Sequence, residues 1–176
     1  QFGLLPKGHD HKYVYGHFGF NLKATDLQAA IGCEQIKKMP EFIAKRRSNW
    51  KFLQNAMSNL ENQLILPQAE PNSIPSWFGF VISLRPDSGL DRSNIIRAIE
   101  AQNIQTRLLF SGNIVRHPCF DAIRNTDAYR VVGGLEKSDF ITKNTFWIGV
   151  YPGMTEAMLE HMVDIITSCV SKNKHL

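Results

Sequence analysis

The first residues that could take part in chemistry lie between Gly8 and Lys23, in a stretch rich in histidine and aromatic side chains. His9, Asp10 and His11 offer two imidazoles and a carboxylate, groups that suit several divalent metal ions. Neighbouring ligands of this kind also arise by chance, so a solvated loop and a ligand-binding loop of a larger active site are alternatives. We favour the ligand-binding loop and expect no metal site.

The end of this stretch, Phe18–Lys23, directly precedes a predicted helix. It contains a glycine, the amide of Asn21 and the ammonium of Lys23. Free N–H groups and the dipole at a helix N-terminus favour anions, so phosphate binding is physically reasonable. A plain turn with a surface lysine fits the same residues equally well.

A second candidate binding stretch is TRLLFSGNIVRHP, residues 106–118. Arg107 and Arg116 are accompanied there by Asn113 and His117, and the planar fork of arginine suits phosphate and carboxylate groups. Alternatively, one arginine closes a salt bridge and His117 packs against Pro118. We expect a ligand-binding role for the stretch as a whole.

Motifs that would supply a reacting centre are missing from this sequence. It has no GxSxG, no Walker loop, no HExxH and no paired acids at a useful spacing. The polar groups are therefore predicted to support a ligand, and no residue of the chain is assigned a catalytic role.

Length and composition restrict the class of protein. The chain has 176 residues, 43% of them hydrophobic and 20% charged, which predicts one domain or slightly more around a buried core. Basic residues exceed acidic ones by 20 to 16, and their scatter argues against a nucleic-acid partner. Apolar runs are too short to cross a membrane. Three cysteines without a CxxC pair favour a reducing cytoplasm.

The elements that must position these side chains begin after residue 24. Thr25 and Gln28 have the spacing of a capping box, which predicts a helix start, and Pro40 suits the first turn of a second helix that ends near residue 60. The first helix carries a face of small residues, which predicts close packing against another element: Ala29, Gly32, Cys33 and Ile36.

The remainder of the chain alternates strand and helix patterns. Strands are predicted over 77–84, 104–110 and 145–150, helices after Asp91 and Thr155, and two short helices within 118–140. This order predicts a small α+β layer, a short sheet with helices packed on one side.

The stretch from Tyr13 to Trp50 resembles the signature of the DegT/StrS-type nucleotide-sugar aminotransferases, which are fold type I pyridoxal-phosphate enzymes. The matching residues are Gly19–Lys23, Thr25–Ala30 and the pair Arg46–Arg47. The resemblance implies the C-terminal domain of the aspartate-aminotransferase-like α/β fold with a long helical arm. Residues 1–24 would be an active-site and dimer-interface loop, 25–60 the arm, and 61–176 the small domain.

Within that family, LPKGHDHKYVYGHFGFN and TRLLFSGNIVRHP are most similar to the 3-dehydrase branch. Those enzymes deoxygenate C3 of a CDP-4-keto-6-deoxyhexose for lipopolysaccharide sugars, using pyridoxal or pyridoxamine 5'-phosphate. Phe20 stands where the branch usually has tyrosine, a mild departure. The resemblance implies that Asn21, His17 and Lys23 lie at the cofactor of a homodimer. It also implies a nucleotide-sugar pocket lined by Arg107, Phe110, Asn113, Arg116, His117, His11 and Tyr13.

The family's remaining catalytic groups match no position of this chain. They include the Schiff-base lysine or the histidine that replaces it, and cysteines that would hold a [2Fe–2S] cluster served by a reductase partner. We therefore expect a fragment of a longer protein that is inactive by itself. The alternatives are a nucleotide-sugar aminotransferase, a stand-alone non-catalytic domain that binds nucleotide sugar or dimerises, and an unrelated α+β binding module.

Overall fold

The computed structural model of the chain describes residues 22–172. The chain divides into two compact units, Gln1–Lys37 and Lys38–Leu176. The predicted sites at His11, Tyr13, His17 and Asn21 lie outside the described residues.

Helix α1, Asp26–Ala56, starts where the capping box predicts. The Thr25 hydroxyl accepts the N–H of Gln28 at 3.3 Å, and the Gln28 carboxamide oxygen accepts the N–H of Thr25 at 3.0 Å. The prediction that Pro40 begins a second helix is wrong, because α1 continues through it. Proline removes one N–H and crowds the preceding turn, but strongly helical neighbours such as Lys38, Met39 and Glu41 allow the helix to continue.

The first unit exposes the apolar side chains of α1. Leu27, Ile31 and Ile36 are exposed, and a Cβ added at Gly32 would meet no heavy atom within 4 Å among the described residues. The close packing predicted for the small-residue face is not seen within residues 22–37 and stays a prediction.

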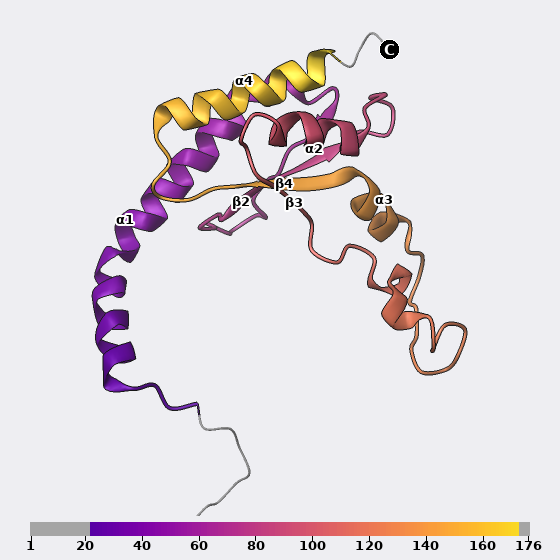
Figure 1. Cartoon of the computed structure of the whole chain (residues 1–176), viewed down its shortest axis with the longest axis horizontal. Helices are drawn as coiled ribbons and strands as arrows, with labels where there is room; N and C mark the ends of the chain where they lie inside the picture. Colours follow the sequence, from indigo (N-terminus) through magenta and orange to yellow (C-terminus); the bar gives the residue numbers. More distant parts are fainter. Residues whose placement is uncertain (1–21, 173–176) are drawn as a thin grey trace, which may run out of the picture. The chain divides into compact units, whose positions relative to one another are not determined.

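The second unit is built on a four-stranded antiparallel sheet with strand order β1-β2-β4-β3, of which Figure 1 labels β2, β3 and β4. Its strands are β1 (Leu64–Ile65), β2 (Gly79–Leu84), β3 (Thr106–Leu108) and β4 (Thr145–Gly149). The fold class is thus the predicted mixed α/β small domain. β1 was not predicted, because two residues are too few to show an alternating pattern.

Three further α-helices belong to this unit: α2 (Arg92–Glu100), α3 (Glu136–Asn144) and α4 (Glu156–Lys172). The predicted cap of α2 is confirmed, since the Asp91 carboxylate accepts the N–H of Asn94 at 2.8 Å. Between residues 118 and 140 there is one α-helix where two were predicted. Where the other helix was predicted, the chain forms a short 3₁₀ helix, Pro118–Phe120, followed by turns.

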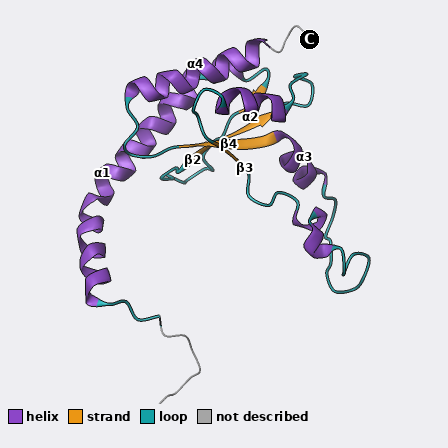
Figure 2. Cartoon of the chain, in the orientation of Figure 1, coloured by secondary structure: helices purple, strands orange, loops and turns teal. Residues whose placement is uncertain are grey.

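Helices α2 and α4 lie on the same side of the sheet (Figure 2). The side chains of the strands that face them are fully buried in one core together with residues of α1, α2 and α4. This core includes Trp50, Leu53, Phe80, Ile82, Leu84, Ile95, Ile99, Phe146, Ile148, Leu159 and Ile166. No helix among residues 22–172 is long and apolar enough to span a membrane.

The other side of the sheet, here called the outer face, is defined by Val81, Arg107 and Trp147. Directly paired residues of an antiparallel sheet point to the same side, and Trp147 pairs with both Val81 and Arg107. These three side chains are exposed or only partly buried. The sheet therefore brings Arg107, a predicted ligand residue, next to an indole ring.

Candidate functional site

The outer face carries a hollow of aromatic and aliphatic side chains. A cavity of about 310 Å³ is lined by Pro75, Ser76, Trp77, Phe78, Gly79, Val81, Leu109, Phe110 and Trp147. Phe78 meets Trp147 edge to face, with ring centroids 5.3 Å apart. Such a surface suits a flat or apolar group of a ligand.

Trp147 is held in place by two features of the sheet. Its indole N–H donates to the carbonyl oxygen of Leu108 at 3.1 Å. Its ring lies against the backbone of Gly79, where an added Cβ would come within 2.7 Å of a ring carbon. A glycine at this position therefore lets the ring lie flat over β2.

Arg107 pairs with Trp147 across β3 and β4 and is exposed. It lines a separate cavity of about 420 Å³, together with Glu100, Asn103, Ile104 and Gln105. One guanidinium N–H donates to the carbonyl oxygen of Thr106 at 2.9 Å. None of the ion pairs within residues 22–172 uses Arg107. An arginine without a carboxylate partner among these residues is a candidate for binding an anionic group such as a phosphate or carboxylate.

The loop after β3, residues 109–117, has a backbone that most side chains disfavour. Phe110 has φ of 47° and Gly112 has φ of 57°, both in the left-handed region. Phe110 is also 74% exposed at the edge of the hollow. An aromatic residue held in this conformation and exposed to solvent is a candidate ligand contact.

Arg116, by contrast, is already engaged within the protein. Its guanidinium makes two hydrogen bonds to the two carboxylate oxygens of Asp139, at 3.1 and 2.8 Å. The salt bridge that was the alternative interpretation of this stretch is therefore formed by Arg116. Hydrogen bonds from Arg116, and after them from Asn113, hold the pKa of Asp139 below its usual value, while Asp139 raises the pKa of Arg116.

Asn113 is only 2% exposed, and its amide is used inside the loop. Its amide nitrogen donates to Asp139 at 2.7 Å, and its amide oxygen accepts the N–H of Val115 at 3.2 Å. Asn113 thus shapes the loop, and both ends of its side chain have partners within the protein.

His117 ends the loop with a similar internal contact. Its Nε2 lies 2.7 Å from the carbonyl oxygen of Ser111, which can only accept, so this nitrogen carries the proton. Arg124 adds a hydrogen bond to the carbonyl oxygen of Val115 at 2.6 Å. The loop is therefore held from several sides.

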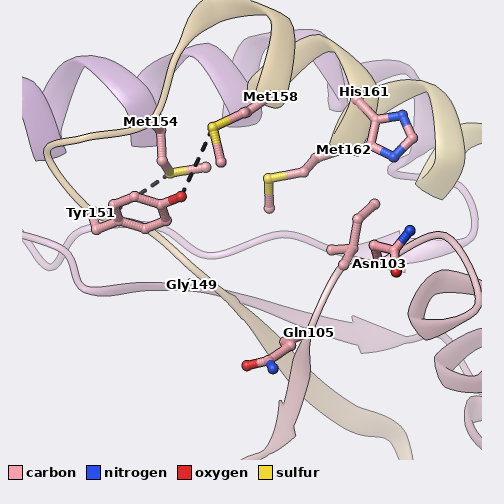
Figure 3. Close-up of a pocket in the computed structure, with 9 residues that line it drawn as sticks. Asn103, Gln105, Gly149, Tyr151, Met154, Met158, His161 and Met162 are labelled. Atoms are coloured by element: carbon pink, nitrogen blue, oxygen red, sulfur yellow. Dashed lines mark hydrogen bonds between the residues drawn. The ribbon is translucent and has the colours of Figure 1, made fainter.

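A second hollow lies between α4 and the segment that follows α2 (Figure 3). This cavity of about 410 Å³ is lined by Asn103, Ile104, Gln105, Gly149, Tyr151, Met154, Met158, His161 and Met162. The Tyr151 hydroxyl points to the sulfur of Met158 at 3.9 Å. The backbone N–H of Tyr151 donates to the sulfur of Met154 at 3.4 Å. His161 donates to the carbonyl oxygen of Gln102 at 3.2 Å. The methionines pack around Tyr151, an ordinary sulfur–aromatic arrangement.

The structure brings together only part of the predicted site. Arg107, Phe110, Asn113, Arg116 and His117 share one region of the second unit, around β3 and the loop after it. Lys23 is exposed in the first unit, shortly before α1. Residues 22–172 contain no cluster of three or more histidine, cysteine or acidic side chains that could hold a metal.

Sequence reasoning missed Asp139 and Thr142 of α3, which contact this loop. The Thr142 hydroxyl accepts the N–H of Asn113 at 2.6 Å and donates to the carbonyl oxygen of Ser138 at 2.7 Å. Both residues lie more than 20 positions beyond the loop, and neither belongs to a motif. No pattern of spacing could have identified them.

Two curated relatives are similar over almost the whole chain. The dTDP-4-dehydro-2,6-dideoxy-D-glucose 3-dehydratase of Saccharopolyspora spinosa is 47% identical over 171 residues, which are 97% of this chain and 36% of that protein. The lipopolysaccharide biosynthesis protein RfbH of Salmonella typhimurium is 45% identical over 163 residues, 93% of this chain and 36% of that protein. The chain thus spans a little over a third of the length of these relatives.

Solved structures agree with the fold. GDP-4-keto-6-deoxymannose-3-dehydratase with a trapped PLP–glutamate geminal diamine has a TM-score of 0.74 at 25% identity, over 84% of this chain and 37% of that one. The Escherichia coli GDP-4-keto-6-deoxy-D-mannose-3-dehydratase with bound hydrated PLP has a TM-score of 0.77 at 24% identity, over 91% and 40%. The match is to the C-terminal portion of aminotransferase-fold chains.

The expectation drawn from the Tyr13–Trp50 resemblance is borne out at the level of the family. The profile of the DegT/DnrJ/EryC1/StrS aminotransferases matches residues 1–167, nearly the full length. The chain belongs to the DegT/DnrJ/EryC1/StrS aminotransferase family.

Proposed function

We propose that the chain is the C-terminal part of a nucleotide-sugar 3-dehydratase that removes the C3 hydroxyl of a CDP-4-keto-6-deoxyhexose in lipopolysaccharide sugar biosynthesis. The observation that carries this proposal is the identity of 47% and 45% to a 3-dehydratase and to a lipopolysaccharide biosynthesis protein. The S. spinosa relative is named for a dTDP sugar, so the choice of CDP rests on the resemblance of the two motifs alone.

The outer face supplies suitable groups for a nucleotide sugar. The Arg107 guanidinium has no acidic partner within residues 22–172 and can bind a diphosphate oxygen. The aromatic hollow on the same face of the sheet, with Trp147 and Phe110, can accept the flat or apolar part of the ligand. Of the other predicted contacts, His117 lies on the same loop, while His11 and Tyr13 lie outside the described residues.

Lys23 is the described residue proposed for the cofactor side, with Asn21 and His17 outside the described part. Its exposed ammonium shortly before the N-terminus of α1 fits a phosphate, because both the charge and the helix dipole favour an anion there. When bound, pyridoxal or pyridoxamine 5'-phosphate supplies an electron sink for the cleavage of bonds next to the reacting carbon. This chain's proposed part is to bind and orient the phosphate and the nucleotide sugar in a homodimer.

The experiment is a turnover assay with the full-length protein that contains this chain, supplied with CDP-, dTDP- and GDP-linked 4-keto-6-deoxyhexoses. We expect a product that has lost the C3 oxygen, and we expect no turnover by the 176-residue chain by itself. An amino sugar as the product would make the protein an aminotransferase of the same family. Turnover by the isolated chain would contradict the proposal that this chain binds the ligands while the rest of the full-length protein carries the catalytic groups. The absence of any nucleotide-sugar binding by the full-length protein would contradict the proposed function.

A further inference from the structure

Two side chains of α3, Asp139 and Thr142, fasten the loop 109–117 to the rest of the small domain. They lie three residues apart, which places them on one face of the helix. Asp139 accepts hydrogen bonds from Asn113 and Arg116, and Thr142 accepts the backbone N–H of Asn113. The backbone carbonyl oxygen of Thr142 also accepts a hydrogen bond from the guanidinium of Arg92 in α2. Helices α2 and α3 and the loop therefore meet at Thr142.

The loop needs this support because its backbone is unfavourable by itself. Phe110 and Gly112 both have positive φ, and a Cβ at Gly112 would clash with the Thr142 hydroxyl. The backbone thus passes Thr142 so closely that only glycine fits. Asn113 is buried, so its N–H has no access to water and depends on the Thr142 hydroxyl.

The same contacts divide the predicted ligand residues into two groups. Arg116 and Asn113 are occupied by Asp139 and hold the loop. Phe110 and Arg107 remain exposed on either side of the loop's start, and Arg107 has no acidic partner within residues 22–172. This contrast supports Arg107, and not Arg116, as the proposed ligand of the negative charge.

We propose that Asp139 and Thr142 are positioning residues for nucleotide-sugar binding: they hold the loop 109–117 in the conformation that exposes Phe110 at the edge of the aromatic hollow. This inference rests on the proposed function. It assigns no chemical step to either residue. The ligand class is a sugar joined to a nucleoside diphosphate.

The test uses the full-length protein and the variants Thr142→Val, Thr142→Ser and Asp139→Asn. Valine keeps the shape of threonine and removes the hydrogen-bond acceptor, whereas serine keeps the acceptor. Thr167→Val and Asp164→Asn on α4 are matched controls away from the loop. For each variant, KM and kcat for the nucleotide sugar, the dissociation constant of CDP and dTDP, and the thermal unfolding temperature are measured.

We expect Thr142→Val to raise KM and the nucleotide dissociation constant about 10-fold to 100-fold, the range expected when the buried N–H of Asn113 loses its partner and the loop leaves its binding conformation. kcat should change much less, Thr142→Ser should restore wild-type KM, and the α4 controls should match the wild type. Asp139→Asn should raise KM as well, because it loses the charge that pairs with Arg116.

A wild-type KM in Thr142→Val overturns the inference. So does a Thr142→Ser variant that is as impaired as Thr142→Val, or a rise in KM that merely accompanies a lowered unfolding temperature and is equalled by the controls. These results leave the proposed function standing if the wild type turns over. If the wild-type protein itself binds no nucleotide sugar, the proposed function fails, and this inference fails with it.

Discussion

The two faces of the sheet have the same strands but opposite characters. On the core face, Phe80, Ile82, Phe146 and Ile148 are completely buried in the core that they share with residues of α2 and α4. On the outer face, the strands expose a cation and an indole ring, Arg107 and Trp147, next to an aromatic hollow. The comparison sets a buried face, which stabilises the domain, against an exposed face for which we propose a role in binding.

The largest expected effect is on the core face. Phe146→Ala should lower the free energy of unfolding by about 3–5 kcal/mol, because it leaves a cavity at a fully buried position. Urea denaturation of the domain measures this change. A loss below about 1 kcal/mol, the average for any substitution, would contradict the assignment of this face as the core.

The matched change on the outer face should act on binding instead. Arg107→Met keeps much of the aliphatic stem and removes the charge, so stability should change by less than about 0.5 kcal/mol. Nucleotide affinity should fall by about 1.5–3 kcal/mol, the range for a hydrogen bond to a charged group. Calorimetric titration of CDP and dTDP into the full-length protein measures it, and unchanged affinity would remove Arg107 from the proposed site.

A smaller effect is expected where the outer face depends on a glycine. Gly79→Ala places a methyl group against the Trp147 ring, so the ring must shift or the strand must move. The cost should be about 1–3 kcal/mol, as for other cases of overpacking. A change in the fluorescence of the indole should accompany it. If spectrum and stability both stay unchanged, the ring does not lie against β2 as described.

The smallest effect concerns the pH dependence of the loop. Hydrogen bonds from Arg116 and Asn113 lower the pKa of Asp139 in the folded protein. The ionised Asp139 carboxylate therefore stabilises the folded protein fully above the pKa of an unfolded aspartate, about 3.9. This stabilisation is lost as the pH falls through the lower pKa of Asp139 in the folded protein. The protection of residues 109–117 against hydrogen exchange, corrected for the intrinsic pH dependence of the exchange rate, should fall only below about pH 4. In Asp139→Asn the exchange should be faster at neutral pH and lack this acid transition, and the same transition in both proteins would contradict the assignment.

The sequence predicted those parts of the fold that depend on local patterns. The alternation of Phe78, Phe80, Ile82 and Leu84 predicted β2, although Phe78 lies just before the strand and is exposed. The caps at Thr25 and Asp91 predicted two helix starts. The prediction that a second helix begins at Pro40 was wrong because the free-energy cost of one proline is small beside the hydrogen bonds of a 31-residue helix.

The sequence identified candidate ligand residues, which stay a prediction, but it did not identify which of them are engaged within the protein. The spacing of Arg107 and Arg116 in one stretch marked both as anion ligands, yet only one lacks a carboxylate partner within residues 22–172. The difference depends on Asp139, which reaches the loop through the packing of α3 and not through the sequence near it. Long-range contacts of this kind leave no local pattern.

The most direct test of the account follows the C3 oxygen itself. The full-length protein is given a CDP-4-keto-6-deoxyhexose that carries a heavy-oxygen label at the C3 hydroxyl, and the label is traced by mass spectrometry. The account predicts that the label leaves the sugar and appears in water. A product that has gained nitrogen and kept the label would contradict C3 deoxygenation and make the protein an aminotransferase.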